Sequence, residues 1–280
     1  IFESVEMSPL FGGVSITWNN QTGTEIGVTV YIEDADGIMR EQATKYSNEI
    51  NAELSFRPFD PVEQHFALKI IDKWGNESEM KEDRITPFFE RELDKSLWSA
   101  MEFPGDNISV NNNRPFKNCW DGSKTVIWHT VEGNFMPMPF YVTIDCGVEA
   151  QFSRMNFLAR ENYWYNNHTF REFEIWGAKD YKPGMDINYW TSDEWKTDGT
   201  WFHVMDCEVK RPSGNPDPSG NPGGADSEFA QKGYEYNVPL TTEAFRYVRI
   251  IVKRTWSSGA MHMAEFYFYG DDGWRPEPEG

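Results

Sequence analysis

The residues best suited to bind a ligand lie together in one loop, which reads Arg-Glu-Asn-Tyr-Trp-Tyr-Asn-Asn-His from position 160. Sugar recognition requires a flat aromatic face for the apolar side of a pyranose, together with amide, guanidinium or imidazole groups that bond adjacent hydroxyls. This loop contains every one of these groups. We therefore predict ligand contacts from Arg160, Tyr163, Trp164, Asn166, Asn167 and His168.

Other rings further along the chain could form a second wall of such a site. The candidates are Trp195, Trp201, Trp256 in the segment Thr255-Trp256-Ser257-Ser258-Gly259, and His262. The alternative is that the aromatic run from Tyr163 to Tyr165 covers the end of a β-barrel core. The sequence leaves both interpretations open.

Composition excludes several classes of partner. The net charge of -19 and the pI near 4.6 argue against nucleic acid and against docking on an anionic membrane, since both require clustered Lys and Arg. No apolar run approaches the roughly 18 residues of a membrane span, so we expect no direct membrane insertion. Aromatic residues make up 16% of the chain, which is typical either of a binding surface or of a β-rich core with large cross-strand pairs.

The sequence offers little support for catalysis. Its five histidines show no metal-ligand spacing, and no nucleophile or phosphate-binding motif is present. The chain has three cysteines, Cys119, Cys146 and Cys207, and this odd number does not indicate a disulfide framework. We therefore expect a protein that is not an enzyme.

The first part of the chain alternates apolar and polar residues over short stretches separated by turns. Val14, Ile16 and Trp18 fall on one face after a Gly-Gly turn, and strands are expected over 26–33 and from Phe66 onward. This spacing predicts a small β-sandwich. With its early buried Trp18, the region resembles a fibronectin type III domain over residues 1–87, which implies a spacer.

Pro87 marks the expected junction, and a second domain is expected over residues 88–280. A strand is predicted from Tyr141 to Cys146, ending at Gly147, and others over 152–160 and 172–177. In the last of these, Phe173 and Ile175 should face the core.

Four blocks of this second region resemble the discoidin domain, also called the coagulation factor 5/8 type C domain, and the related family 32 carbohydrate-binding modules. They are the Asp-Gly turn before Trp128, the strand ending in Asp145-Cys146-Gly147, the strand from Phe245 to Ile250, and the closing strand from Ala264 to Gly270. The resemblance covers about residues 90 to 270. It implies an all-β chain whose second domain is a galactose-binding-like jelly roll.

The resemblance also implies a structural calcium ion that joins the Asp-Gly turn to the closing strand. Asp121 and Glu265 would then supply carboxylates, while Ser123 and Cys119 would offer backbone carbonyls, as a hard cation requires. The family's threonine before the tryptophan is Val126 here. Either calcium binds, or Asp121 only caps its own turn.

One segment breaks the strand pattern. Residues 211–225 repeat Pro, Ser, Gly and Asn and are not expected to pack, which predicts a mobile surface loop, either a lid or an insertion without a role.

Together the two resemblances imply an extracytoplasmic protein similar to surface glycan-utilisation lipoproteins of the bacterial outer membrane, with any anchor ahead of Ile1. The expected ligand is a polysaccharide or oligosaccharide, bound at a loop edge of the jelly roll. The alternative is a protein-interaction or structural module of a surface assembly, in which the same aromatics would bury against partner proteins.

Overall fold

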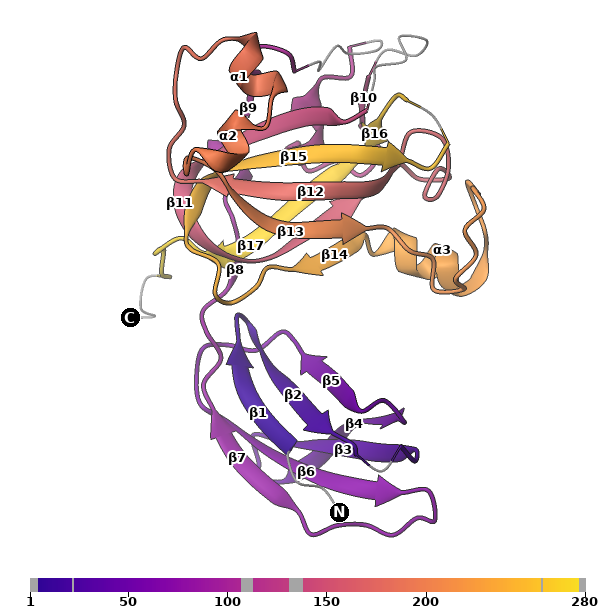
Figure 1. The fold of residues 1–280 in the computed structure, drawn as a ribbon. Coiled ribbons are helices and arrows are strands. Elements are labelled where there is room, and N and C mark those ends of the chain that lie inside the picture. Colours follow the sequence, from indigo (N-terminus) through magenta and orange to yellow (C-terminus); the bar gives the residue numbers. More distant parts are fainter. Residues whose placement is uncertain (1–4, 22, 107–112, 131–137, 258, 277–280) are drawn as a thin grey trace. The chain divides into compact units, whose positions relative to one another are not determined.

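A computed structural model of the chain describes residues 5–21, 23–106, 113–130, 138–257 and 259–276. The chain divides into two compact units, Ile1–Arg91 and Glu92–Gly280 (Figure 1). Strands dominate both units, which confirms the predicted all-β class. Among the helices in the described ranges, none is long and apolar enough to cross a membrane.

The first unit is a sandwich of two antiparallel sheets. One sheet has the order β1-β2-β5 and the other the order β4-β3-β6-β7. Their inner faces share one core, in which Trp18 is 3% exposed, as its alternating pattern predicts. The strands are β1 (Val5–Leu10), β2 (Gly13–Asn19), β3 (Ile26–Glu33), β4 (Met39–Ser47), β5 (Asn51–Phe56), β6 (Gln64–Asp72) and β7 (Lys81–Ile85).

The second unit is built on an eight-stranded sheet with the order β13-β12-β15-β11-β17-β8, to which β14 and β9 add by pairing with β11. Its sheet strands are β8 (Arg91–Glu92), β9 (Ser99–Met101), β11 (Phe140–Leu158), β12 (Phe170–Ala178), β13 (Phe202–Glu208), β14 (Tyr234–Asn237), β15 (Phe245–Thr255) and β17 (Glu265–Asp271). The remaining elements are the 3-10 turns η1 (Lys95–Leu97) and η2 (Phe116–Trp120), the helices α1 (Ile187–Thr191), α2 (Glu194–Thr197) and α3 (Gly224–Gln231), and the paired strands β10 (Trp128–His129) and β16 (His262–Met263).

The long strand β11 holds the two halves of this unit together. Its first half pairs with β15 and its second half with β17, and the register shifts between Asp145 and Ala150. The strand was predicted to end at Gly147, and this is wrong, because the strand bends there and continues to Leu158. Gly147 has φ +76°, and a Cβ on it would lie 2.7 Å from Leu97, so the bend requires glycine.

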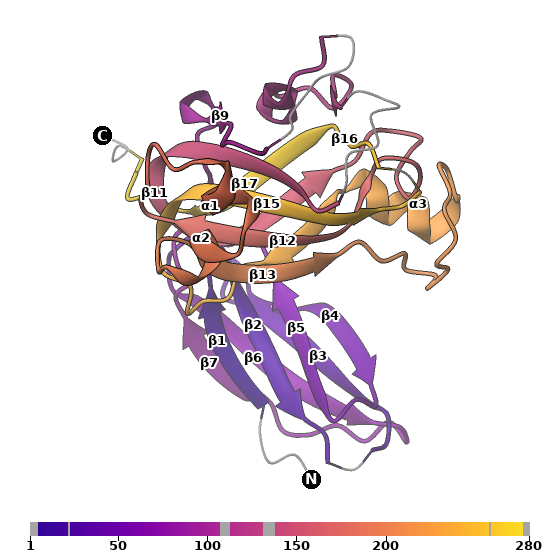
Figure 2. The same cartoon turned by 45° about the horizontal axis from the view of Figure 1, so that its top comes forward.

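Two apolar clusters cover the opposite faces of the sheet. On the inner face, Phe173 and Ile175 are buried as predicted, together with alternate residues of β11. The helices α1 and α2 lie over the outer face (Figure 2). Their side chains Tyr189, Trp190 and Trp195 cluster with Tyr247 and Ile251 of β15. All three cysteines are buried and free, and burial raises the pKa of each thiol.

Candidate functional site

The candidate ligand loop connects the end of β11 to the start of β12. Two of its asparagines, Asn162 and Asn167, have positive φ values of 63° and 48°, a conformation that asparagine tolerates better than most residues. The Thr169 hydroxyl donates to the Tyr163 carbonyl at 2.6 Å and closes the loop onto itself. The loop is therefore a turn with a defined backbone conformation.

Five of the six side chains predicted from this loop are half-buried, and together they are here called the loop edge. They are Arg160, Tyr163, Asn166, Asn167 and His168. The Arg160 guanidinium lies 4.2 Å from the centre of the Tyr163 ring, so the two side chains form a cation-π pair. This edge offers one aromatic ring, one guanidinium, two amides and one imidazole within nine consecutive residues.

The sixth predicted residue, Trp164, does not belong to this edge. It is 4% exposed and packs in the inner core, so it presents no face to a ligand and its prediction is corrected. Its carbonyl accepts a hydrogen bond from the Tyr234 hydroxyl at 2.6 Å, and its N–H donates to the Gly220 carbonyl at 3.3 Å. The sequence could not reveal this, because the covering backbone comes from more than fifty residues further on.

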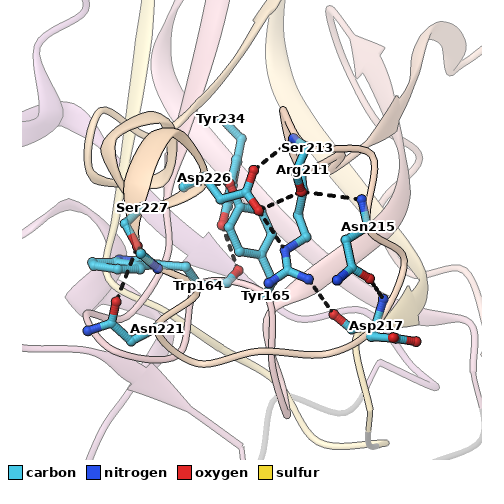
Figure 3. Close-up of polar contacts among 11 residues, drawn as sticks. Trp164, Tyr165, Arg211, Ser213, Asn215, Asp217, Asn221, Asp226, Ser227 and Tyr234 are labelled. Carbon is cyan, nitrogen blue, oxygen red and sulfur yellow. Dashed lines mark hydrogen bonds and ion pairs between the residues drawn. The ribbon is translucent and has the colours of Figure 1, made fainter.

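That covering backbone belongs to residues 211–227, here called the strap. Residues 212–218 are exposed, which agrees with the predicted surface loop, but the expectation that the stretch does not pack is wrong at its two ends, which one buried ion pair joins (Figure 3). Arg211 Nε lies 3.2 Å from Asp226 Oδ2, with side chains 4% and 9% exposed. Ser213 donates to Asp226 from its hydroxyl at 2.7 Å and from its N–H at 2.8 Å, and these bonds lower the pKa of the Asp226 carboxyl.

The strap also bonds directly to the candidate loop. The Tyr165 hydroxyl donates to the Asp226 carbonyl at 2.8 Å, and the backbones of Tyr165 and Ser219 exchange hydrogen bonds at 2.8 and 3.3 Å. These contacts hold one side of the loop against α3 (Figure 3). The strap is therefore a structural support for the candidate site.

The predicted second wall is only partly present. Trp195 and Trp201 are buried in the cluster on the outer face of the sheet, and Trp256 is 6% exposed beneath the Arg171 guanidinium, so these three predictions are corrected. Ser257, in contrast, joins the loop, since its N–H donates to the Asn167 carbonyl at 2.9 Å. Ser258 lies outside the described residues.

Three histidines, one of them His168 of the loop itself, form a cluster that local sequence spacing could not reveal. The ring centres of His129, His168 and His262 lie 5.1 to 5.6 Å apart, and Tyr163 packs edge-on against His262 at 5.5 Å. His262 is fully buried, and neither of its ring nitrogens has a hydrogen-bond partner in the described part of the chain. Within that part, no three His, Cys, Asp or Glu side chains are arranged to hold a metal ion.

This cluster predicts a loss of stability in acid. Burial, followed by the nearby His168, His129 and Arg160, holds the pKa of His262 well below 6.5. Below about pH 6.5 the unfolded chain therefore binds more protons than the folded one, and stability falls as the pH falls. Relative to His262→Phe, the wild type should lose up to about 1.4 kcal/mol of unfolding free energy per pH unit, measured by urea unfolding.

A matched control is His203→Phe, which removes an imidazole that is 40% exposed. This variant keeps all three clustered histidines, so His262→Phe should differ from it in pH dependence as it differs from the wild type. Equal slopes for the wild type and His262→Phe would contradict the prediction.

The three residues predicted for calcium lie near one another, but each has other bonds. The Asp121 carboxylate accepts from the Ser123 N–H at 2.8 Å, and the Ser123 hydroxyl accepts from the N–H of Val126 at 3.1 Å, so both stabilise their own turn. Glu265 is fully buried and accepts from the Gly122 N–H at 3.3 Å, which ties the turn to β17.

Each unit of the chain matches the model of a known protein family. A model for a domain of unknown function, DUF5000, matches residues 116–270, and one for another domain of unknown function, DUF5126, matches residues 1–96. Membership of the fibronectin type III family therefore stays a prediction for the first unit. No curated protein matches the sequence.

Solved structures include similar proteins. The SusE-like protein BT2857 is 25% identical, with 96% of this chain and 97% of that chain covered and a TM-score of 0.57. CBM32-3 from a family 31 glycoside hydrolase of Clostridium perfringens is 19% identical over 64% of this chain and 95% of its own, with a TM-score of 0.46. The family 32 module of Clostridium perfringens NanJ, solved with galactose, is 14% identical over 65% of this chain and 99% of its own, with a TM-score of 0.43.

Proposed function

For this chain, which belongs to the DUF5000 family of domains of unknown function, we propose a role as a non-catalytic carbohydrate-binding protein of the bacterial cell surface. The glycan would bind at the loop edge of the second unit. Similarity to a SusE-like protein over almost the whole chain supports the surface location. The lipid anchor expected from the sequence is part of the same proposal.

The observation that carries the proposal is the set of side chains on this edge. Tyr163 would stack on the apolar face of a pyranose, and Arg160 and His168 would donate to its hydroxyls. Asn166 and Asn167 add two side-chain amides. The Asn166 amide oxygen accepts from the Ser257 hydroxyl at 3.2 Å, and the main-chain carbonyl of Asn167 accepts from the Ser257 N–H at 2.9 Å. Because Trp164 and Trp256 are buried, Tyr163 is the stacking ring in this arrangement.

The test is retardation in native gels that contain plant, mucin or microbial polysaccharides, comparing the wild type with Tyr163→Ala. We expect one glycan to retard the wild type, and the variant to bind it at least about tenfold more weakly, which corresponds to about 1.4 kcal/mol. Tyr46→Ala is the matched control, because this tyrosine is 59% exposed and lies in the first unit.

Two outcomes would contradict the proposal at different levels. If no glycan retards the wild type, carbohydrate binding is wrong and a protein partner becomes the better explanation of the edge. If a glycan retards the wild type and Tyr163→Ala equally, the protein binds sugar at another site.

A further inference from the structure

The carboxylate of Glu265 poses an electrostatic problem at the start of β17. Glu265 is fully buried, and its Oε2 atom has no hydrogen-bond partner in the described part of the chain. Burial raises the pKa of this carboxyl, and the nearby Lys95 opposes that shift. A charge in such a place requires a cation beside it, because an unpaired buried charge is strongly destabilising.

Lys95 provides that cation from within the chain. Its Nζ lies 2.6 Å from Glu265 Oε1 and 3.2 Å from Glu92 Oε1, and its side chain is only 14% exposed. The same ammonium lies 3.5 Å from the centre of the Tyr267 ring, which adds a cation-π contact. Two carboxylates and one aromatic face therefore surround the ammonium.

The short turn η1 fixes the backbone that presents this lysine. The Asp94 carboxylate accepts from the Ser96 N–H at 2.9 Å and so caps the turn. The N–H of Leu93 donates to the carbonyl of Phe268 at 2.8 Å, which attaches the preceding residues to β17. The capped turn η1 and its attachment to β17 therefore hold the Lys95 backbone close to Glu265.

The residues present fit an ammonium better than a calcium ion. Calcium takes six to eight oxygen ligands at about 2.3–2.6 Å. Glu265 offers it one open oxygen, Oε2, and an ion on Oε1 would compete directly with Lys95 Nζ. Asp121 and Ser123 accept backbone N–H groups of their own turn, and the Gly122 N–H is directed at the same Glu265 oxygen. We propose that Lys95 is a built-in cation that joins η1, the Asp-Gly turn and β17, so that the second unit folds without calcium.

The first test uses the unaltered protein. Thermal unfolding of the wild type should give the same Tm in calcium chloride and in excess EDTA, and calorimetric titration with calcium chloride should show no saturable binding heat. A Tm that rises by several degrees with calcium and falls with EDTA would overturn the proposal.

The second test removes the ammonium. Lys95→Met should lower the Tm by about 5–15 °C, because it leaves Glu265 buried without a counter-ion. Adding Glu265→Gln to this variant should recover part of the loss, since the uncompensated charge is then gone. Lys179→Met is the matched control, because its ion pair with Glu243 is largely exposed, and it should leave the Tm unchanged.

Two results with the variants would contradict the proposal. One is a Tm for Lys95→Met equal to that of Lys179→Met. The other is a double variant that is no more stable than Lys95→Met alone. If Lys95→Met does not fold, the comparison of calcium with EDTA on the wild type still decides the question.

Discussion

Replacing Arg249 by methionine is expected to lower the unfolding free energy of the second unit by about 3–5 kcal/mol, because it leaves a buried carboxylate without its partner. Arg249 Nη2 and Nη1 lie 2.6 and 2.9 Å from the two oxygens of Asp106, and the two side chains are 0% and 1% exposed. The guanidinium also donates to the Thr143 hydroxyl at 2.7 Å.

Aromatic rings enclose this ion pair on the outer face of the sheet. The centres of the rings of Phe103, Tyr141, Trp190 and Trp195 all lie within 5.2 Å of the Arg249 guanidinium carbon. Such rings stabilise the cation, but their faces carry no donors that could replace the guanidinium hydrogen bonds Asp106 loses in the variant. The cost of breaking the pair should therefore not be relieved by the surrounding side chains.

Urea unfolding followed by tryptophan fluorescence measures this effect, since most tryptophans lie in the second unit. Arg275→Met is the matched control, because Arg275 makes the same two-pronged contact with Asp271 at 2.8 Å but is 52% exposed. The control should leave the urea midpoint unchanged. Equal midpoints for the two variants would show that burial does not set the cost.

Asp226→Ala should release the strap while the rest of the second unit stays folded. The variant loses the ion pair with Arg211 and both bonds from Ser213, which close the strap at its two ends (Figure 3). We expect backbone amides of residues 211–227 to exchange with deuterium at least about tenfold faster, because local opening then requires less free energy. The amides of Trp164 and Tyr165 should accelerate as well, since they donate to strap carbonyls.

The control for this experiment is Asp217→Ala. Asp217 contributes its carbonyl to Arg211 at 2.8 Å, a main-chain contact that the substitution preserves. Exchange in this variant should match the wild type. If Asp226→Ala also exchanges at the wild-type rate, the ion pair is not what holds the strap.

Alternation along single strands made much of the fold predictable. The inward positions of Phe173 and Ile175 and the burial of Trp18 follow from a period of two, which depends only on local sequence. The end of β11 was predicted wrongly because a glycine can either end a strand or bend one. Gly147 signals a turn in sequence, whereas the fold uses its positive φ to bend a strand that continues.

The candidate site was harder to predict because its parts are distant in sequence. The chemical types in the loop could be identified. The contacts of its neighbours could not, because the Trp164 N–H bonds to Gly220 and the Trp256 ring lies beneath Arg171, each in a distant segment. The histidine cluster draws on three separate segments, so no spacing rule could find it. Contact of the loop residues with a glycan remains a prediction.

The pairing of β8 with β17 has a consequence for how this unit could be combined with other domains. The first strand of the second unit, β8, and its last strand, β17, are neighbours in the sheet. The Leu93 N–H, just after β8, donates to the Phe268 carbonyl of β17 at 2.8 Å. A unit whose ends meet can be inserted into an exposed loop of another protein with little distortion of the host. Gene fusions should therefore tolerate it within a sequence as well as at a terminus, and linking its ends should allow circular permutation.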